Sequence, residues 1–515
     1  MNRRMAVLRS ITLVSAATYV EYALGLVVSI WIARTLGPAD FGRYAFTLWL
    51  CGWLMTCSNH ALTTSSTKFI AEADGAGAPD IASHIAHRLS GYQHLSTLIV
   101  LALFVLMTAI IQPSEWQQFL LPVTVFVVIA VAAKANYFML VAIEKGQERF
   151  EPAAISTVLT GVIGIGLIGS ATLIHAPVID FIALFAVACL IINLVNRLAF
   201  RRYCRPFTAG PIPVETSRRL SRHLRLTAAL VLLISLKASM IEVFLLNTFS
   251  TSTAVGFFAI AATLTRGAVD LFSVGLTATL LPYMAKSFGQ NGHEQAARLL
   301  ADATRFYWAA GLIIAGVGLV TTPEIVTLMY GQRYVQAIPA IEATLVLSGL
   351  LLIGNSIAAF QIVIDRQDDR VRISIMALVV NAVLGIALIP FYGLAGAVLT
   401  YAGTRFAELG LAIIYLRRTT AGGLPVAAMA RLLAVAVAAT TIAWLTVVML
   451  HSRFGFIAAG MVFVVVFLPA SFLVRYWSDD DYALMTVITN RLGPPGRMLM
   501  RGLGALQGAP TKATS

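Results

Sequence analysis

The chain has 515 residues, of which 58% are hydrophobic and only 12% are charged, and its mean hydropathy is +0.83. Soluble domains carry roughly 25% charged residues, so the composition excludes an ordinary soluble protein and predicts an all-α polytopic membrane protein. The net charge of +13 then indicates basic segments on the cytoplasmic side of a membrane. Because apolar runs flank these segments, the charge does not indicate a nucleic-acid partner.

Apolar stretches of about 20 residues, the length that crosses a bilayer, recur along the chain and predict about 14 transmembrane helices. The first follows Arg3, Arg4 and Arg9, and its apolar run is too long for the core of a signal peptide, so we expect a retained span. The predicted spans cover residues 10–33, 43–63, 89–111, 119–143, 153–174, 178–199, 226–248, 253–281, 301–322, 339–364, 372–390, 393–416, 428–450 and 455–475.

The most basic stretch, residues 197–225, lies between the sixth and seventh predicted spans and contains eight arginines opposed only by Glu215. A Pro/Gly-rich centre breaks any helix within it. Basic connections stay in the cytoplasm, where they also attract anionic lipid of the inner leaflet. With the N-terminus inside, the predicted external loops hold only four of the 37 Lys and Arg residues, Arg34, Arg43, Arg333 and Arg453. This bias predicts an even number of spans and two cytoplasmic termini.

Two weak internal repeats suggest that the chain is duplicated. The acid, base and Arg pattern of residues 144–149 recurs in residues 365–370, and Gly42 at the start of the second span matches Gly256 at the start of the eighth. In both matches, a predicted span corresponds to the span six positions later in the chain. They predict two six-helix lobes related by a pseudo-twofold axis along the membrane normal, with two extra C-terminal helices.

The resulting domain organisation has five parts. They are an N-terminal lobe (1–205), a basic cytoplasmic connector (206–225), a C-terminal lobe (226–420), transmembrane helices 13 and 14 (421–475) and a cytoplasmic tail (476–515). In the tail, Ser478 followed by three aspartates is typical of a helix N-terminus and predicts a short interfacial helix. A solvated tail is the alternative.

Three motifs resemble those of a known family. The stretch Thr35-Leu-Gly-Pro-Ala-Asp-Phe-Gly-Arg-Tyr44 resembles a signature of the polysaccharide biosynthesis flippases, and residues 328–334 and 392–397 also resemble that family. These proteins are the O-antigen and exopolysaccharide repeat-unit translocases of the multidrug/oligosaccharidyl-lipid/polysaccharide (MOP) superfamily. The resemblance implies a V-shaped pair of six-helix lobes in the bacterial inner membrane.

The same resemblance implies a function. Members of the family move undecaprenyl-diphosphate-linked oligosaccharides from the inner to the outer leaflet. The expected partners are therefore this lipid-linked substrate, membrane lipids, and the polysaccharide polymerase and export machinery. No cofactor is expected: none of the four cysteines has metal-ligand spacing, and the sequence contains no P-loop for ATP.

Charged residues within spans are the candidate site, because a central charge costs about 2.5–3.5 kcal/mol on insertion scales and usually faces a cavity or a partner. The candidate substrate-binding cations are Lys134, Lys237, Arg266 and Arg405, which match the negative charge of a lipid diphosphate. The candidate ion-coupling carboxylates are Glu21 and Asp270.

Each candidate also has a structural alternative. Arg266 and Asp270 have the i,i+4 spacing of a neutralising pair, and Arg405 and Glu408 have the i,i+3 spacing of a structural pair. Lys134 stands beside Asn136 and Tyr137, and the 144/365 repeat makes Asn355 its counterpart. A hydrogen-bonded structural Glu is the alternative for Glu21. Asp302 and Arg305 are placed near the cytoplasmic end of their span, where Arg305 can snorkel.

Other functions fit the sequence less well. His84 and His87 share a predicted loop with Asp80, which favours a solvated face over a catalytic site. A membrane polysaccharide polymerase or ligase needs a sizeable external loop, and the longest predicted here covers only residues 323–338. A multidrug/cation antiporter of the same superfamily is the closer alternative.

Overall fold

The computed structural model describes residues 3–111, 119–238, 240–419, 424–450, 455–478, 481–482 and 485–486. In these residues the chain is helical, without a β-strand. It forms two compact units, residues 1–256 and 257–515. The lobe boundaries inferred from the sequence stay a prediction.

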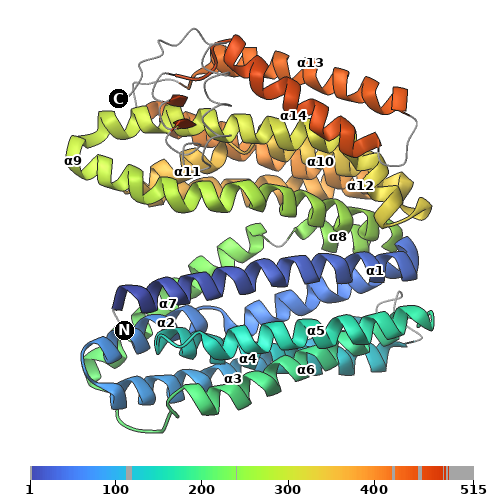
Figure 1. Ribbon diagram of the computed structural model, residues 1–515. Coiled ribbons are helices and arrows are strands. Elements are labelled where there is room, and N and C mark those ends of the chain that lie inside the picture. The colour runs from blue at the N-terminus through green and yellow to red at the C-terminus, as the bar shows by residue number, and fades with distance from the viewer. Residues whose placement is uncertain are drawn as a thin grey trace. The chain divides into compact units, whose positions relative to one another are not determined.

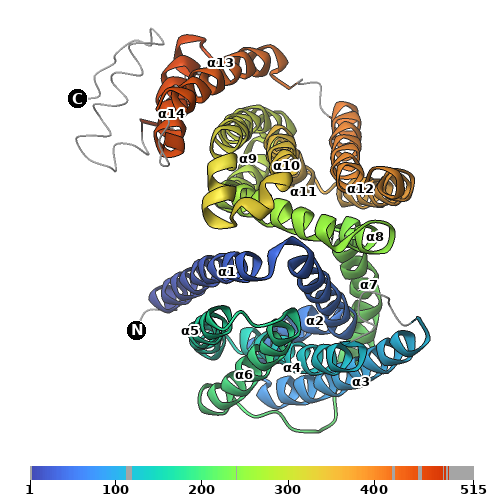
Figure 2. The same cartoon turned by 90° about the vertical axis from the view of Figure 1, so that its right-hand side faces the viewer.

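The described residues of unit 1 form eight helices and the first residues of α9; Figures 1 and 2 show the course of these helices. They are α1 (Arg3–Asn59), α2 (Leu62–Gly75), α3 (Pro79–Ile111), α4 (Leu120–Gly146), α5 (Glu151–Leu173), α6 (Val178–Tyr203), α7 (Val214–Ala238) and α8 (Ile241–Phe249). A kink at Gly37, whose φ of 76° suits a residue without Cβ, divides α1 just before Pro38. Helix α4 is central, since it packs against α1, α2, α3 and α6.

Polar contacts inside unit 1 join α4 to α5 and α6. The amide of Asn196 on α6 donates to Glu144 Oε1 at 2.7 Å and accepts from Ser156 Oγ of α5 at 3.0 Å. All three side chains are fully buried. Because buried polar groups need partners, this network fixes the ends of three helices relative to one another.

Unit 2 begins within α9 (Ser252–Met329), which is kinked at Gly292, where φ is 73°. The following elements are η2 (Gln332–Ala337), α10 (Ile338–Leu350), α11 (Gly354–Val363), α12 (Gln367–Thr419), α13 (Val426–Leu450) and α14 (Gly455–Leu473). Helices α13 and α14 form a hairpin, which both views show (Figures 1 and 2). The second half of α9 approaches α10 closely, because a Cβ on Gly311 would lie 2.0 Å from the Gly349 carbonyl oxygen.

Eleven helical segments of the described residues are long and apolar enough to cross a membrane. Two of them each contain two predicted spans: Leu24–Asn59 is divided at Gly37, and Gln367–Arg418 is divided at Gly393. Every predicted span except 226–248 overlaps one of the eleven. The fold class is therefore confirmed as an all-α polytopic membrane protein, and 14 is an approximate number of spans.

The seventh predicted span differs because its residues are divided between α7 and α8. Met240, which precedes α8, has a left-handed backbone with φ of 53°, so one continuous helix is not formed. The sequence around Met240 holds neither Gly nor Pro, so composition does not mark this break.

The two loops of the sequence repeat follow helices that end in the same way. After α4, Glu148 has φ 56° and the Arg149 N–H donates to the Glu144 carbonyl; after α11, Asp365 has φ 57° and the Arg366 N–H donates to the Gln361 carbonyl. The same ending follows α5 at His175 and α14 at Arg475, so it is a general helix terminus of this chain. The match of residues 144–149 with residues 365–370, and with it the pairing of Lys134 with Asn355, stays a prediction.

Candidate functional site

Lys134 lies on α4 and is held by aromatic rings. Its Nζ is 4.6 Å from the ring centroid of Tyr137 and 5.4 Å from that of Phe138. The Tyr137 hydroxyl is 3.2 Å from the hydroxyl of Thr157 on α5. The lysine side chain is half-buried. A ring face attracts a cation, so the tyrosine both places the ammonium group and reduces the cost of its partial burial.

Arg405 on α12 has a similar arrangement in unit 2. Its guanidinium carbon is 5.4 Å from the ring centroid of Tyr401, and its Nη1 is 3.4 Å from Glu408 Oε2. The Tyr401 hydroxyl is 2.8 Å from the hydroxyl of Ser348 on α10. The Arg405 side chain is nevertheless 45% exposed, so the Glu408 contact leaves part of the guanidinium accessible to an anion.

Lys134 and Arg405 therefore have the same supporting arrangement within each unit. A cation in a predicted span lies over a tyrosine ring, and a hydroxyl on a neighbouring helix contacts the tyrosine. We call these groups the Lys134 station (Lys134, Tyr137 and Thr157) and the Arg405 station (Arg405, Tyr401 and Ser348). The cations and Tyr137 were predicted from the sequence, whereas Thr157 and Ser348, which lie on other helices, were not.

Arg266 is exposed on the first half of α9, and Asp270 is half-buried one turn later. No ion pair joins these two described side chains, although their i,i+4 spacing permits one. The neighbouring Thr265 instead contacts the hydroxyl of Thr344 on α10 at 3.0 Å. The two remaining candidates, Glu21 and Lys237, have side chains outside those that the structure describes.

The basic connector packs against helices α2, α3, α4 and α6 of unit 1. Ile212 and Leu220 are buried in an apolar cluster with residues of α2, α3, α4 and α6. Arg219 pairs with Glu72 of α2 at 2.8 Å, and Arg205 pairs with Asp74. The hydrogen bond and charge of Glu72 raise the pKa of Arg219. Arg219 of the connector and Arg205 directly before it are thus both paired with acidic residues of α2.

Other arginines of this region point outward. The exposed ones without an ion pair in the described residues are Arg197, Arg201, Arg202, Arg218, Arg222 and Arg225. The last three are spaced along one face of α7, opposite the buried Leu220. This basic face precedes the apolar part of α7.

The histidine prediction needs a correction. His84 and His87 lie within helix α3, not in a loop, and His84 Nδ1 is 3.0 Å from the Pro211 carbonyl oxygen. His84 therefore helps to bind the connector. Within the described residues, no group of three or more His, Cys, Asp or Glu side chains could hold a metal ion.

The fold is similar to solved structures of two kinds of transporter. "Lipid II flippase MurJ, inward closed conformation" has a TM-score of 0.66 and 13% identity, over 89% of this chain and 97% of that chain. An inward-facing multidrug resistance MATE family transporter of the MOP superfamily has a TM-score of 0.59 and 15% identity, over 80% and 100%. A Vibrio cholerae MATE transporter has a TM-score of 0.50 and 16% identity, over 81% of this chain and 99% of that chain. At these identities the likeness concerns the fold alone.

The chain therefore has the fold of the MOP flippases and transporters. A family model described as polysaccharide biosynthesis protein matches residues 7–288, more than half of the sequence. The chain belongs to the polysaccharide biosynthesis protein family. The match contains the motif at residues 35–44, whereas the motifs at residues 328–334 and 392–397 lie beyond it. No curated protein matches the sequence.

Proposed function

We propose that this protein is a flippase that carries undecaprenyl-diphosphate-linked oligosaccharide repeat units across the cytoplasmic membrane by alternating access. Its product would supply the biosynthesis of a cell-surface polysaccharide. The observation that carries the proposal is the pair of tyrosine-supported cations, Lys134 and Arg405, within apolar segments. A diphosphate crossing the bilayer loses its hydration, and such cations replace part of it. Family membership and the similarity to a lipid II flippase support the same class of substrate.

Arg266 and Lys237 are proposed as further cations for the diphosphate. Arg266 fits this role because it is exposed and its side chain has no ion pair in the described residues. Its guanidinium can form two parallel hydrogen bonds with a phosphate group, which an ammonium cannot. Glu21 and Asp270 are proposed to bind the coupling ion, since a carboxylate in a span can take up and release a proton.

The proposed location is the bacterial inner membrane, with both termini in the cytoplasm. The outward arginines of α7 support this orientation, because basic residues next to a span stay inside and attract anionic lipid. A polymerase and export machinery on the outer side are the proposed consumers of the translocated repeat unit.

The competing function is a multidrug/cation antiporter of the same superfamily, and cross-linking separates the two. The purified protein in lipid nanodiscs is exposed to a photoactivatable undecaprenyl-diphosphate oligosaccharide. Unlabelled undecaprenyl-diphosphate sugar should displace the probe, whereas a lipophilic cation such as tetraphenylphosphonium should not. Lys134→Met and Arg405→Gln should each weaken labelling by about tenfold, the effect of losing ~1.4 kcal/mol of a charge-assisted contact.

The control for this experiment is Arg298→Gln. Arg298 is an exposed α9 residue whose contact with Glu294 is long, 3.9 Å, so its loss should leave labelling unchanged. Displacement by the lipophilic cation at lower concentration than by the diphosphate sugar would favour the antiporter. Labelling of an external loop together with polymer formation would favour a polymerase or ligase.

A further inference from the structure

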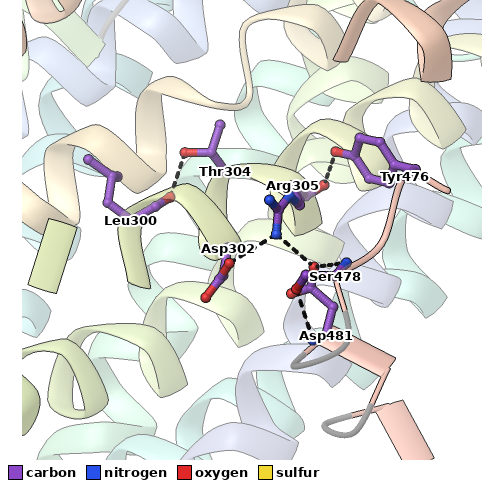
Figure 3. Close-up of polar contacts among 7 residues, drawn as sticks. All are labelled: Leu300, Asp302, Thr304, Arg305, Tyr476, Ser478 and Asp481. Atoms are coloured by element: carbon purple, nitrogen blue, oxygen red, sulfur yellow. Dashed lines mark hydrogen bonds and ion pairs between the residues drawn. The ribbon is translucent and has the colours of Figure 1, made fainter. Parts of the chain in front are cut away.

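The segment that follows α14 is fastened to α9 by a buried ion pair (Figure 3). Arg305 Nη1 lies 3.1 Å from Asp481 Oδ2 and 3.0 Å from Asp302 Oδ1. The Asp481 side chain is only 2% exposed, although it follows directly on two further aspartates in the sequence. A buried carboxylate needs a partner, and here the partner is 176 residues away in the sequence.

Asp481 also closes the first turn of a helix. The Ser478 N–H donates to Asp481 Oδ2 at 2.9 Å, and the Asp481 N–H donates to Ser478 Oγ at 3.2 Å. This reciprocal capping box confirms the helix start predicted at Ser478. The same carboxylate oxygen therefore binds the helix N-terminus and Arg305 together, so the capped turn is joined to α9.

A second contact fixes the backbone of α9 at the same residue. The Tyr476 hydroxyl donates to the Arg305 carbonyl oxygen at 2.8 Å, and Tyr476 is 2% exposed (Figure 3). Burial raises the pKa of Tyr476, so the hydroxyl keeps its proton and remains a donor. The next residue, Trp477, donates its indole N–H to Ser471 of α14 at 2.9 Å and packs on Phe306 of α9. The side chain and the carbonyl of Arg305 are thus both bound.

The rest of the α13–α14 hairpin lies against the same half of α9. Trp308 Nε1 donates to the Met429 carbonyl of α13 at 3.1 Å. About two helical turns further along α9, Gly316 makes room for the Phe463 ring of α14, since a Cβ there would be 2.2 Å from that ring. The ion pair lies at one end of this contact line along α9.

We propose that Tyr476, Ser478 and Asp481, with Asp302 and Arg305, form a latch that makes the α13–α14 hairpin and the second half of α9 move as one body. Arg305 and Asp481 are then positioning residues for the transport cycle. Arg305 Nε is buried without a hydrogen-bond partner, so the guanidinium depends on its two carboxylates for compensation. The consequence for transport rests on the proposed flippase function, whereas the coupling of the helices does not.

Hydrogen–deuterium exchange of the full-length protein in nanodiscs tests the coupling without any substrate. In the wild type, residues 468–478, which cover the end of α14 and the segment after it, and the Asp302–Trp308 part of α9 should exchange slowly and together. Asp481→Asn keeps an oxygen for the Ser478 N–H but loses the charge. It should speed exchange of residues 468–478 by about tenfold or more, the effect of losing a buried charge-assisted hydrogen bond.

Two further variants keep the test decisive. Tyr476→Phe removes only the hydroxyl and should have a smaller effect of the same kind, even if Asp481→Asn proves unstable. Glu294→Gln breaks the exposed Arg298 pair on the same helix and should change nothing. Unchanged exchange in both latch variants would overturn the proposal.

Transport is measured on the same samples, per folded protein. The latch predicts that Asp481→Asn lowers turnover severalfold while substrate binding is unchanged. Full turnover despite faster exchange would show that the contact is only structural and would also overturn the proposed role. A wild type with coupled exchange that moves no lipid-linked oligosaccharide would refute the proposed function and leave the latch in place.

Discussion

Lys134 and Arg405 show how single residues can keep a charge inside an apolar segment. Each cation lies over a tyrosine ring, and each tyrosine hydroxyl contacts a hydroxyl on another helix. The ring lowers the cost of partly burying the charge, and Arg405 also contacts the carboxylate of Glu408. We propose that both groups, held in this way, attract the anionic substrate.

Substitutions at Tyr137 separate the ring from the hydroxyl. Tyr137→Leu removes the ring beneath Lys134 and should lower flipping by about two- to fivefold, the equivalent of ~0.5–1 kcal/mol for a cation–π contact. Tyr137→Phe keeps the ring and loses only the Thr157 contact, so its activity should stay near the wild type. Lys134→Met should lower the flipping activity more than either tyrosine substitution. Turnover in proteoliposomes checks the order, and equal activity of Lys134→Met and wild type would remove this station from the site.

Cys204 gives a residue-scale prediction with a pH dependence. Burial, and then the charge of Glu144, raise the pKa of the thiol to about 12. Because the thiolate is the reactive form, the reaction with a maleimide should be slow at pH 7.5 and should accelerate as the pH rises toward 12. With the other three cysteines replaced, it should be at least about tenfold slower than a cysteine at the exposed Ser221.

Glu144→Gln checks the cause of the Cys204 shift. Loss of the carboxylate charge should lower the pKa of the thiol and move the rate profile to lower pH. A Cys204 that reacts as fast as the exposed cysteine at pH 7.5 would contradict the proposed environment.

At the scale of helices, close backbone contacts decide which glycines are required. A Cβ on Gly42 of α1 would lie 1.7 Å from the Ser252 carbonyl oxygen, whereas a Cβ on Gly52 of the same helix meets nothing within 4 Å. Gly42→Ala should therefore force the helices apart and destabilise unit 1 by about 1–3 kcal/mol, as overpacking does. Gly52→Ala should be neutral or slightly stabilising. Thermal unfolding of the purified variants measures both, and equal unfolding temperatures would contradict the contact.

Helices were largely predictable because long apolar segments are a local property of the sequence. The kink at Gly37 lies in the gap between the first two predicted spans, and the kink at Gly393 falls on the first residue of the predicted span 393–416, since glycine marks both. The break at Met240 was not predictable because no Gly or Pro signals it. Helical spacing gave the right partner for Arg405 but suggested a pair at Arg266 and Asp270 that does not form.

Contacts between segments far apart in the chain could not be predicted from the sequence. The capping signal at Ser478 was visible, but nothing local connects Asp481 with Arg305. The same holds for Thr157 and Ser348, whose contacts depend on how helices pack. The sequence therefore indicated which charges need an explanation, and the structure supplied their neighbours.

For the whole molecule, we expect transport to be driven by an ion gradient or by the membrane potential. The sequence has no P-loop, so transport should depend on an ion gradient or on the membrane potential. One charge moving across the membrane gains about 2.3 kcal/mol per 100 mV, enough to bias a two-state carrier. Ionophores that collapse the proton and sodium gradients should slow flipping by about tenfold or more. A flipping rate that stays the same after both gradients are collapsed would eliminate Glu21 and Asp270 as coupling residues.

The central claim is that this member of the polysaccharide biosynthesis protein family flips a lipid-linked oligosaccharide with the help of cations inside its spans. The most direct test is uptake of fluorescent undecaprenyl-diphosphate oligosaccharide, produced by the host, into energised inverted membrane vesicles. Vesicles with the wild-type protein should move the lipid to the luminal leaflet well above protein-free vesicles. The Lys134→Met/Arg405→Gln double variant, inserted at equal abundance, should approach the protein-free rate. Wild-type uptake no faster than in protein-free vesicles, or a double variant as fast as the wild type, would contradict the account.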